Sequence, residues 1–335
     1  MKIALVTTTI NIPSILELYK DALDWNNMAI FVAADEKTPV KVEAFCYDLS
    51  NKIHYLTPTK QHYFGYNCSD LIGWNCIQRR NIATLEALKW GADVIFTFDD
   101  DNISNWKDFY HFEWGRFTGF QAWHDEGWFD PGTLLIPACR HRGFPFKKSD
   151  IGIKHIVNAK VGVMAGLCIG DPDIDATLRM EKEPIVHSVS ELAREGVVVD
   201  PKVMKTVFNS QNTAFVRELA PAMFMLPGIG RYDDIVASLV AQRVMEELGY
   251  VVHFGKPFAW QQRNDHDLVK DLENEMWGMR NFMAVHDALN DVYLEPALSV
   301  IDKVRHLYRG LKKVLPNMSR EAGLAWCDDC ERVMK

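Results

Sequence analysis

The sequence lacks any apolar run that approaches the ~20 residues needed to cross a bilayer. It also lacks a secretory signal, because the stretch from Met1 to Val6 is too short for a hydrophobic signal region and has no small-residue cleavage site. From these two absences we expect neither a membrane-spanning protein nor a secreted one. We therefore expect a cytoplasmic protein with no membrane partner.

Cysteine is too scarce and too scattered for a disulfide framework. The chain has 7 cysteines among 335 residues, an odd number, which favours reduced thiols. Cys327 and Cys330 form a lone CxxC pair, and one pair cannot complete a four-ligand zinc site. A zinc or redox role is therefore not expected there.

Excess positive charge is also absent. With 37 Lys and Arg against 45 Asp and Glu, the net charge is −8, so a nucleic-acid backbone is not an obvious partner. The glycine-rich GxGxxG of dinucleotide-binding folds is missing from the first strand–helix turn. The remaining composition, 48% hydrophobic and 24% charged, is typical of a globular domain.

The most informative segment that is present runs from Asp93 to Asn102. Its β-branched and aromatic residues predict a buried strand, and the strand ends in Asp99, Asp100 and Asp101. Adjacent carboxylates repel one another, so a fold keeps them together only with a cation or with hydrogen bonds. Two interpretations stay open. The acids hold a divalent metal that clamps a diphosphate, or they form a turn that caps the next helix.

The segments at the start of the chain, residues 2–8, 15–25 and 29–34, predict a β-α-β opening and hence a parallel, Rossmann-like sheet. Asp35 follows the second strand, where a carboxylate can accept hydrogen bonds from a base or a ribose. The alternative for Asp35 is a solvated loop acid. The pattern predicts strands at residues 2–8, 29–34, 54–56 and 94–98, and helices at residues 15–25 and 76–90. A loop rich in aromatic and polar residues is expected at residues 61–75.

Several basic and polar residues are candidates for the same site. Arg79 and Arg80 begin a predicted helix, and an arginine fork binds phosphate bidentately, so we expect one to face the site and the other solvent. We assign Thr7, at the end of the first strand, to the nucleotide contacts. The most basic stretch, residues 140–148, contains Arg142. It either neutralises a leaving diphosphate or forms a solvated loop.

Further along the chain, seven aromatic residues between Trp106 and Phe120 indicate a buried wall or a stacking platform. A strand is expected at residues 133–138. A glycine-rich turn then leads into a predicted helix over 233–248. Asp233 and Asp234 at its start either favour the helix dipole or supply a catalytic base or acceptor-binding carboxylate.

Six motifs occur in a defined order, and together they resemble the plant reversibly glycosylated polypeptides, the UDP-arabinopyranose mutases, and the related STELLO-type glycosyltransferase-like proteins. The resemblance covers about residues 1–275. The motifs lie at residues 97–101, 142–146, 172–176, 212–219, 230–234 and 263–268.

This resemblance implies a GT-A-like, mostly parallel sheet flanked by helices. Residues 1–265 would form the nucleotide-sugar-binding catalytic domain, and residues 266–335 a helical extension. It also implies Mn²⁺ or Mg²⁺ at Asp99 and Asp101. Our own candidates for donor contacts, apart from the resemblance, are Thr7, Asp35, Arg79, Arg80, Asp99, Asp100, Asn212 and Arg231.

The chain departs from the plant pattern at two places. Arg142 falls on the arginine linked to reversible glycosylation, but Lys147, Lys148 and Ser149 stand where a second arginine is found. Gln261 replaces a histidine after the last strand. Both departures argue against mutase activity and leave a nucleotide-sugar site in place.

Three functions are therefore compatible with the sequence. The first is a metal-dependent glycosyltransferase that uses a nucleoside-diphosphate sugar, with Arg142, Asp233 and Asp234 as catalytic candidates. The second is a sugar-nucleotide mutase, and the third is a non-catalytic scaffold. The acceptor is undetermined, and a homo-oligomer is compatible with the sequence.

Overall fold

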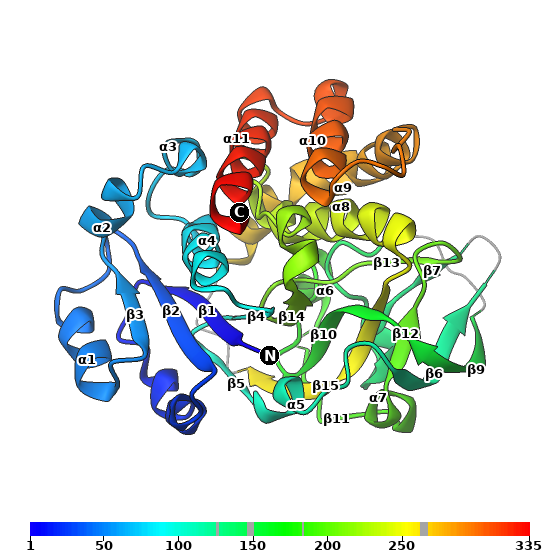
Figure 1. Ribbon diagram of the computed structural model, residues 1–335. Helices are drawn as coiled ribbons and strands as arrows, with labels where there is room; N and C mark the ends of the chain where they lie inside the picture. The colour runs from blue at the N-terminus through cyan, green and yellow to red at the C-terminus, as the bar shows by residue number, and fades with distance from the viewer. Residues whose placement is uncertain (125–126, 146–150, 183, 262–266) are drawn as a thin grey trace.

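The computed structural model describes residues 1–124, 127–145, 151–182, 184–261 and 267–335. Within these ranges one mixed sheet has the strand order β3-β2-β1-β4-β14-β10-β15-β12-β6-β9, with β5 paired to β15 (Figure 1). Its strands are β1 (Ile3–Thr9), β2 (Met28–Ala34), β3 (Ile53–Leu56), β4 (Val94–Phe98), β5 (Asn102–Ser104), β6 (Phe117–Trp123), β9 (Gly152–Ala159), β10 (Val161–Gly170), β12 (Val197–Val199), β14 (Asn212–Val216) and β15 (Val251–Gln261).

Helices flank this sheet, and two short strand pairs lie outside it. The α-helices are α1 (Lys41–Leu49), α2 (Pro58–Tyr63), α3 (Asn67–Ile72), α4 (Arg80–Trp90), α5 (Lys107–Tyr110), α6 (Ala176–Glu181), α7 (Glu191–Glu195), α8 (Asp233–Leu248), α9 (Leu268–Asn290), α10 (Val300–Gly310) and α11 (Asn317–Met334). The 3₁₀ helices are η1 (Ser14–Glu17), η2 (Lys20–Asp24), η3 (Ile77–Arg79), η4 (Pro131–Leu134), η5 (Arg217–Ala222), η6 (Gly230–Tyr232) and η7 (Leu311–Lys313). The short pairs are β7 (Trp128–Phe129) with β13 (Lys205–Thr206), and β8 (Leu135–Ile136) with β11 (Ser188–Val189).

The strand directions bring distant segments to one edge of the sheet. Strands β3, β2, β1 and β4 are parallel, whereas β14 runs antiparallel to both β4 and β10. Asn212, at the start of β14, therefore pairs with Phe98 at the end of β4. This pairing places the segment before β14 beside the acids that follow β4.

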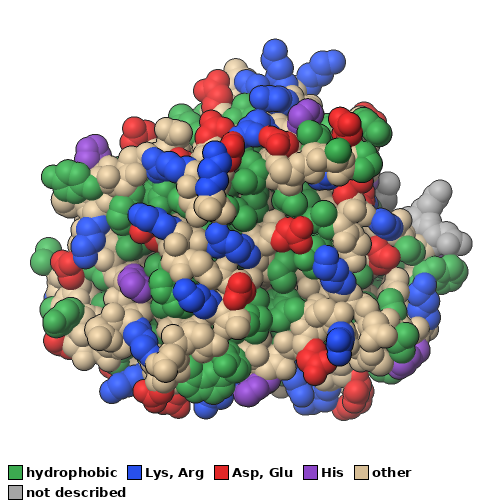
Figure 2. Space-filling view, viewed as in Figure 1, with side chains coloured by type: hydrophobic (Ala, Val, Ile, Leu, Met, Phe, Trp, Pro, Cys, Tyr) green, Lys and Arg blue, Asp and Glu red, His purple; other side chains and the backbone are tan. Residues whose placement is uncertain are grey.

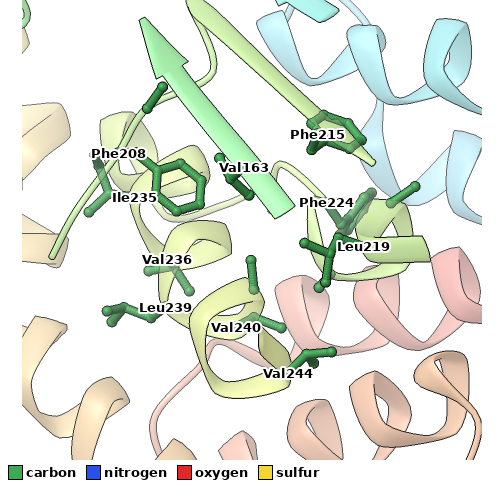
Figure 3. Close-up of a cluster of buried hydrophobic side chains, with 14 of the residues drawn as sticks. Val163, Phe208, Phe215, Leu219, Phe224, Ile235, Val236, Leu239, Val240 and Val244 are labelled. Carbon is green, nitrogen blue, oxygen red and sulfur yellow. The ribbon is translucent and has the colours of Figure 1, made fainter. Parts of the chain in front are cut away.

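Both faces of the sheet are buried at β1, β2 and β4. Alternate residues of a strand point to opposite faces, so Ile3 and Leu5 pack with η1, η2 and α1, whereas Ala4 and Val6 pack with α4. Helix α8 covers the face of β10 and β14, as Figure 3 shows. Burial on both faces explains the continuous apolar runs that predicted these strands.

The C-terminal helices belong to the same hydrophobic core as this sheet face. Trp326 of α11 is fully buried and stacks on Phe224 with ring centroids 5.0 Å apart. Its indole N–H donates to the carbonyl of Pro221 at 2.9 Å. The predicted domain boundary at residues 265 and 266 lies outside the described residues and stays a prediction. No helix within the described ranges combines the length and apolarity that crossing a membrane requires.

Asp329 ties α11 to the N-terminal half of the chain. Its carboxylate accepts hydrogen bonds from the backbone N–H groups of Asn67 at 3.0 Å and Cys68 at 2.8 Å, at the start of α3. We expect Asp329→Ala to lower the free energy of unfolding by about 1–3 kcal/mol, because two largely enclosed donors lose their acceptor. The neighbouring, more exposed Asp328 is the control, and Asp328→Ala should cost less than about 1 kcal/mol. Equal losses in urea denaturation would contradict this role.

Most predicted elements are confirmed, and three are wrong. The predicted helix over 15–25 is the pair of 3₁₀ helices η1 and η2, since packing of its apolar residues on the sheet decides its geometry. The predicted loop over 61–75 contains α3 and the end of α2, which Pro58 begins at the first helical position. The predicted strand over 133–138 is η4 followed by the two-residue β8, which ends before Pro137, a residue without an N–H to donate.

Candidate active site

A continuous cleft lies along the edge of the sheet where β1 and β4 end. It consists of two adjoining cavities of 540 Å³ and 350 Å³. Both are lined by Asn75, Cys76, Ile77, Asp99 and Asp101. The larger cavity is also lined by Gln78, Arg142, Asp173, Arg231, Asp233 and Asp234, and the smaller by Thr8, Thr9, Asn11, Lys37, Arg80 and Asp100.

Two acids of the triplet after β4 have protein partners. Asp99 forms an ion pair with Arg80, and Arg80 also donates to the carbonyl of Ser210 at 3.1 Å. Asp100 accepts a hydrogen bond from the hydroxyl of Thr9, which lowers its pKa, although burial raises that pKa more. Hydrogen bonds and one ion pair thus offset part of the repulsion that the sequence implied.

The carboxylate of the third acid, Asp101, has fewer of its hydrogen-bonding sites satisfied. Burial, and then the charges of Asp99 and Asp100, raise the pKa of Asp101 to about 6. Its Oδ1 atom is buried and has no hydrogen-bond partner among the described residues. A carboxylate oxygen in that state is suited to a cation.

The carboxylates fit a divalent metal only if a ligand supplies further oxygens. In the part of the chain that the structure describes, no three His, Cys, Asp or Glu side chains cluster closely enough to hold an ion. Mg²⁺ is commonly held by one or two carboxylates together with phosphate oxygens. Asp99 and Asp101 could form such a pair, so the predicted metal remains compatible with the donor set.

Asp35 holds the cleft wall rather than projecting freely toward a ligand. Its carboxylate accepts three backbone N–H groups, from Glu36 at 2.7 Å, Asn75 at 2.6 Å and Cys76 at 3.0 Å. Asp35 is 2% exposed. The predicted contact of Asp35 with a base or ribose stays a prediction, whereas its contact with the loop is present in the structure.

The two neighbouring arginines have different surroundings. Arg80 faces the cleft, whereas Arg79 is directed away from it, donating to Gln61 at 3.0 Å and lying 3.8 Å from the ring centre of Trp74. Burial lowers the pKa of Arg79. The expectation that one arginine faces solvent is wrong, because both side chains are buried. Trp74 and Gln61 enclose Arg79, and sequence spacing gave no sign of that pocket.

Thr7 and Asn212 are buried beneath the cleft. The hydroxyl of Thr7 donates to the carbonyl of Phe98 at 2.8 Å, which ties β1 to the end of β4. The amide of Asn212 donates to the carbonyl of Pro257 at 2.9 Å and accepts from Ser104 at 2.8 Å. Neither lines the two cavities described above, so their predicted donor contacts stay predictions.

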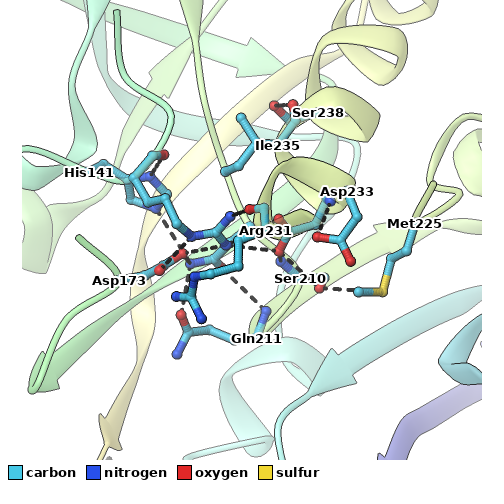
Figure 4. Close-up of polar contacts among 12 residues, drawn as sticks. His141, Asp173, Ser210, Gln211, Met225, Arg231, Asp233, Ile235 and Ser238 are labelled. Atoms are coloured by element: carbon cyan, nitrogen blue, oxygen red, sulfur yellow. Dashed lines mark hydrogen bonds and ion pairs between the residues drawn. The ribbon is translucent and has the colours of Figure 1, made fainter. Parts of the chain in front are cut away.

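Arg142 is buried and forms an ion network with Asp173 and Asp234. Figure 4 shows Asp173, Arg231 and Ser210, which lie close together in this part of the site. The Nε and Nη2 of Arg142 donate to the two oxygens of Asp173, each at 2.8 Å, and Nη2 also donates to Asp234 at 3.1 Å. Its Nη1 donates to the carbonyl of Arg231. Burial would raise the pKa of Asp173, but the Arg142 guanidinium holds it well below its usual range. All three guanidinium nitrogens of Arg142 therefore have protein partners.

Asp233 and Asp234 begin α8, as the sequence predicted, but they have different partners. Asp234 accepts from Arg142 and from the backbone N–H of Ser210 at 3.0 Å. Asp233 accepts from Gln78 at 2.7 Å and from the N–H of Asp234 at 2.9 Å. Burial, and then the neighbouring Asp234, raise the pKa of Asp233 to about 7. A group with that pKa can exchange a proton near neutral pH.

Helix α9 forms one wall of the cleft. Arg231 of η6 pairs with Glu275 of α9 at 3.1 Å and with Asp271 at 3.5 Å. Gly230 has φ +62°, and a Cβ there would lie 2.0 Å from the carbonyl oxygen of Asn274. Only glycine fits this close approach. The helical extension therefore positions Arg231 and does more than cover the sheet.

Sequence reasoning missed several polar residues of the site. Gln211 donates to Gln261 at 2.7 Å, and Asn209 donates to Asp173 at 2.8 Å. The antiparallel return of β14 brings Gln211 to the lining of the cleft. The acids at 171–175 form ion pairs: Asp171 pairs with Arg179, Asp173 with Arg142 and Asp175 with Arg140. The motif residues 146–149 and 263–266 lie outside the described residues.

The fold confirms the predicted α/β class, a mixed sheet flanked by helices, with an acid-lined cleft at one edge of that sheet. Comparison with known proteins also confirms the resemblance that the motifs indicated. A pea (Pisum sativum) protein described as probable UDP-arabinopyranose mutase 1 is 31% identical over 144 residues, which are 41% of this chain and 36% of the pea protein. UDP-arabinopyranose mutase 3 of Arabidopsis thaliana is 31% identical over 144 residues, 41% of this chain and 37% of that protein.

These matches span little more than a third of the length of each relative. No known family profile matches the chain. Among solved structures, residues 1–349 of S. aureus TarS in complex with UDP-GlcNAc align with a TM-score of 0.42 and 12% identity, over 100% of this chain and 90% of that chain.

Proposed function

We propose that the protein is a glycosyltransferase that takes a nucleoside-diphosphate sugar, with uridine as the expected base, and transfers the sugar to an acceptor hydroxyl. The observation that carries this proposal is the continuity of one cleft, from the acids after β4 to Asp233 at the start of α8. The acids would hold the diphosphate end of the donor. Asp233 would take the proton of the acceptor.

The division of work follows from the partners of each residue. Asp99 and Asp101 would hold Mn²⁺ or Mg²⁺, and the metal would neutralise the charge of the leaving diphosphate. Arg80 fixes Asp99 on one side of the cleft. Asp234 is engaged by Arg142 and Ser210, whereas Asp233 has a raised pKa and accepts from the neutral side-chain amide of Gln78 and backbone N–H of Asp234. Asp233 is therefore the better candidate for the base.

A mutase is the second candidate, and the names of the plant relatives favour it. The position of Arg142 speaks against it. If the arginine linked to reversible glycosylation in the plant proteins acted here, Arg142 would have to leave Asp173, Asp234 and the carbonyl of Arg231. A buried guanidinium with three such partners is poorly placed to accept a sugar.

The test is product analysis with donor alone and then with candidate acceptors. Incubation with UDP-sugars and Mn²⁺, followed by chromatography of the sugar nucleotides, separates the two candidates. A ring-isomerised sugar nucleotide would establish a mutase and overturn the proposal. Slow hydrolysis to UDP, accelerated by an acceptor, would support a transferase. To choose the donor, thermal unfolding is first measured with each nucleotide, because a ligand at ~100 times its Kd stabilises by about 2.7 kcal/mol.

We expect Asp101→Asn to weaken metal-dependent donor binding, since it removes a charge from the proposed metal pair. The measurement is the Kd of UDP with and without Mn²⁺, by calorimetry. The wild type should bind at least about tenfold more tightly with the metal, and the variant should lose that difference, which corresponds to ~1.4 kcal/mol. Asp171→Asn, outside the cleft lining and paired with Arg179, is the control. An unchanged metal effect in Asp101→Asn would remove Asp101 from the metal site.

A further inference from the structure

The loop between α3 and η3 has a constrained backbone that Asp35 holds in place. Gly73 has φ +73° and Asn75 has φ +61°, a region that residues other than glycine rarely adopt and that asparagine tolerates best. The N–H groups of Asn75 and Cys76 both donate to the buried carboxylate of Asp35. The end of β2 therefore fixes a loop that lines both cavities of the cleft.

Gln78 follows this loop and reaches across the cleft to α8. Its amide Nε2 donates to Oδ2 of Asp233 at 2.7 Å. The next two residues are also fixed, because Arg79 is held by Gln61 and Trp74, and Arg80 is held by Ser210 and Asp99. The backbone on both sides of Gln78 is thus anchored, so the position from which its side chain extends is fixed.

We propose that Gln78 is a positioning residue that holds the Asp233 carboxylate in place for proton transfer, and that Asp35 sets the position of Gln78 through the loop. This inference rests on the proposed function of Asp233 as the base. An amide suits the role because it donates at every pH and carries no charge. A carboxylate has about four lone-pair sites, so one amide bond leaves others for an acceptor hydroxyl.

The charges around Asp233 define what Gln78 contributes. Burial and the carboxylate of Asp234 disfavour the ionised form of Asp233, whereas Arg142 and the Gln78 amide favour it. Other charged groups of the same cavity are Asp99, Asp101, Asp173 and Arg231. A hydrogen bond to the charged form of a carboxylate lowers its pKa. Removing the Gln78 donor should therefore raise the pKa of Asp233 further.

The experiment measures the titration of Asp233 directly, by carboxyl-carbon NMR of the full chain, with the signal assigned through Asp233→Asn. In Gln78→Leu, which is similar in size and has no donor, we expect the titration to move to higher pH by about one pH unit. Gln78→Glu, which places a carboxylate there, should move it at least as far. Ile77→Val, directly before Gln78 in η3, should leave it at the wild-type value.

Asp35→Asn tests the second half of the proposal. The loop should loosen, because a neutral amide accepts the N–H groups of Asn75 and Cys76 less strongly than a carboxylate does. The titration of Asp233 should then move in the same direction as in Gln78→Leu. An unchanged titration in Asp35→Asn would remove Asp35 from the proposal, and an unchanged titration in both Gln78→Leu and Gln78→Glu would overturn it.

The same variants separate this inference from the proposed function. NMR titration needs no turnover. If the pKa of Asp233 shifts in a protein that transfers no sugar, the proposed function is wrong but the coupling between Gln78 and Asp233 is supported. In an active protein, kcat/KM falls as pH drops through the pKa of Asp233, because the base must be ionised. In Gln78→Leu, this fall of kcat/KM at low pH should occur at higher pH, by the same shift in pKa that NMR records. If the pH at which kcat/KM falls is unchanged in Gln78→Leu, Gln78 does not act through the base.

Discussion

Asp233→Asn is expected to lower kcat by about 10²–10⁴-fold, the usual contribution of a positioned base. The substitution keeps the size of the side chain and can still accept a hydrogen bond from Gln78, so the fold should persist. An asparagine amide cannot take a proton from an acceptor. Donor affinity should stay near the wild-type value, because the acids after β4 and Arg80 are unchanged. Steady-state kinetics and UDP binding check both statements.

Asp234→Asn is the informative comparison for this prediction. Asp234 pairs with Arg142 and accepts from Ser210, so its loss should lower stability as well as activity. If Asp233→Asn retained wild-type kcat while Asp234→Asn lost it, Asp234 would be the base. If neither variant changed kcat, the start of α8 would not take part in the chemistry.

Arg142→Ala is expected to lower the free energy of unfolding by about 3–5 kcal/mol, because it leaves Asp173 and Asp234 buried without their counter-charge. Arg142→Lys should fall between this value and the wild type, since a lysine keeps the charge but loses the fork that meets both oxygens of Asp173. Arg140→Ala is the matched control. Arg140 pairs with Asp175 but is partly exposed, and we expect a smaller loss there.

The loss in Arg142→Ala should depend on pH. In the wild type, the pKa of Asp173 is held below its unfolded value of about 3.9, so the ion pair contributes fully above that pH and less as the pH falls through the folded pKa. In the variant, burial raises the pKa of Asp173 instead, so protonation relieves the buried charge at acidic pH. Urea unfolding at pH 4 and pH 8 should show the larger difference between the two proteins at pH 8. Equal differences would show that Asp173 is not the cause.

Much of the fold followed from patterns within short segments. The apolar runs at residues 29–34 and 94–98 predicted strands because both faces of these strands are buried. The helix over 233–248 was predicted with its observed bounds, since its acids, apolar residues and following Gly249 are all local signals. Segments with weak local signals, such as residues 15–25, took the geometry that packing imposed.

The site was predicted in its parts but not in its connections. The acids after β4 and those that begin α8 stood out because carboxylates at strand and helix ends are unusual and chemically active. The sequence did not show that Gln78 contacts Asp233, or that Arg142 contacts Asp173, because these pairs are brought together only by the folded sheet. Residue type therefore identified the reactive groups, and distance in the fold decided which of them interact.

The charged residues also show this difference between what residue type predicts and what the folded structure decides. The net charge of −8 gave no reason to expect a polyanion site, and Figure 2 shows acidic and basic side chains interspersed over one face. The basic stretch over 140–148 could equally have been a surface loop. The structure instead buries Arg142 in it, because Asp173 and Asp234 offset the cost of removing its charge from water.

By itself, the sequence determined the class of fold, the buried strands and the acidic ends of β4 and α8, because alternation, apolar runs and helix-start residues depend on neighbours a few positions apart. Only the tertiary structure decided that the antiparallel β14 brings Gln211 to the cleft, that Asp35 holds the loop at Asn75, and that α9 supplies a wall. The contact between Gln78 and Asp233 likewise joins residues 155 positions apart. Burial and ion pairing between such distant groups depend on how the whole chain packs, and local propensity carries no information about that packing.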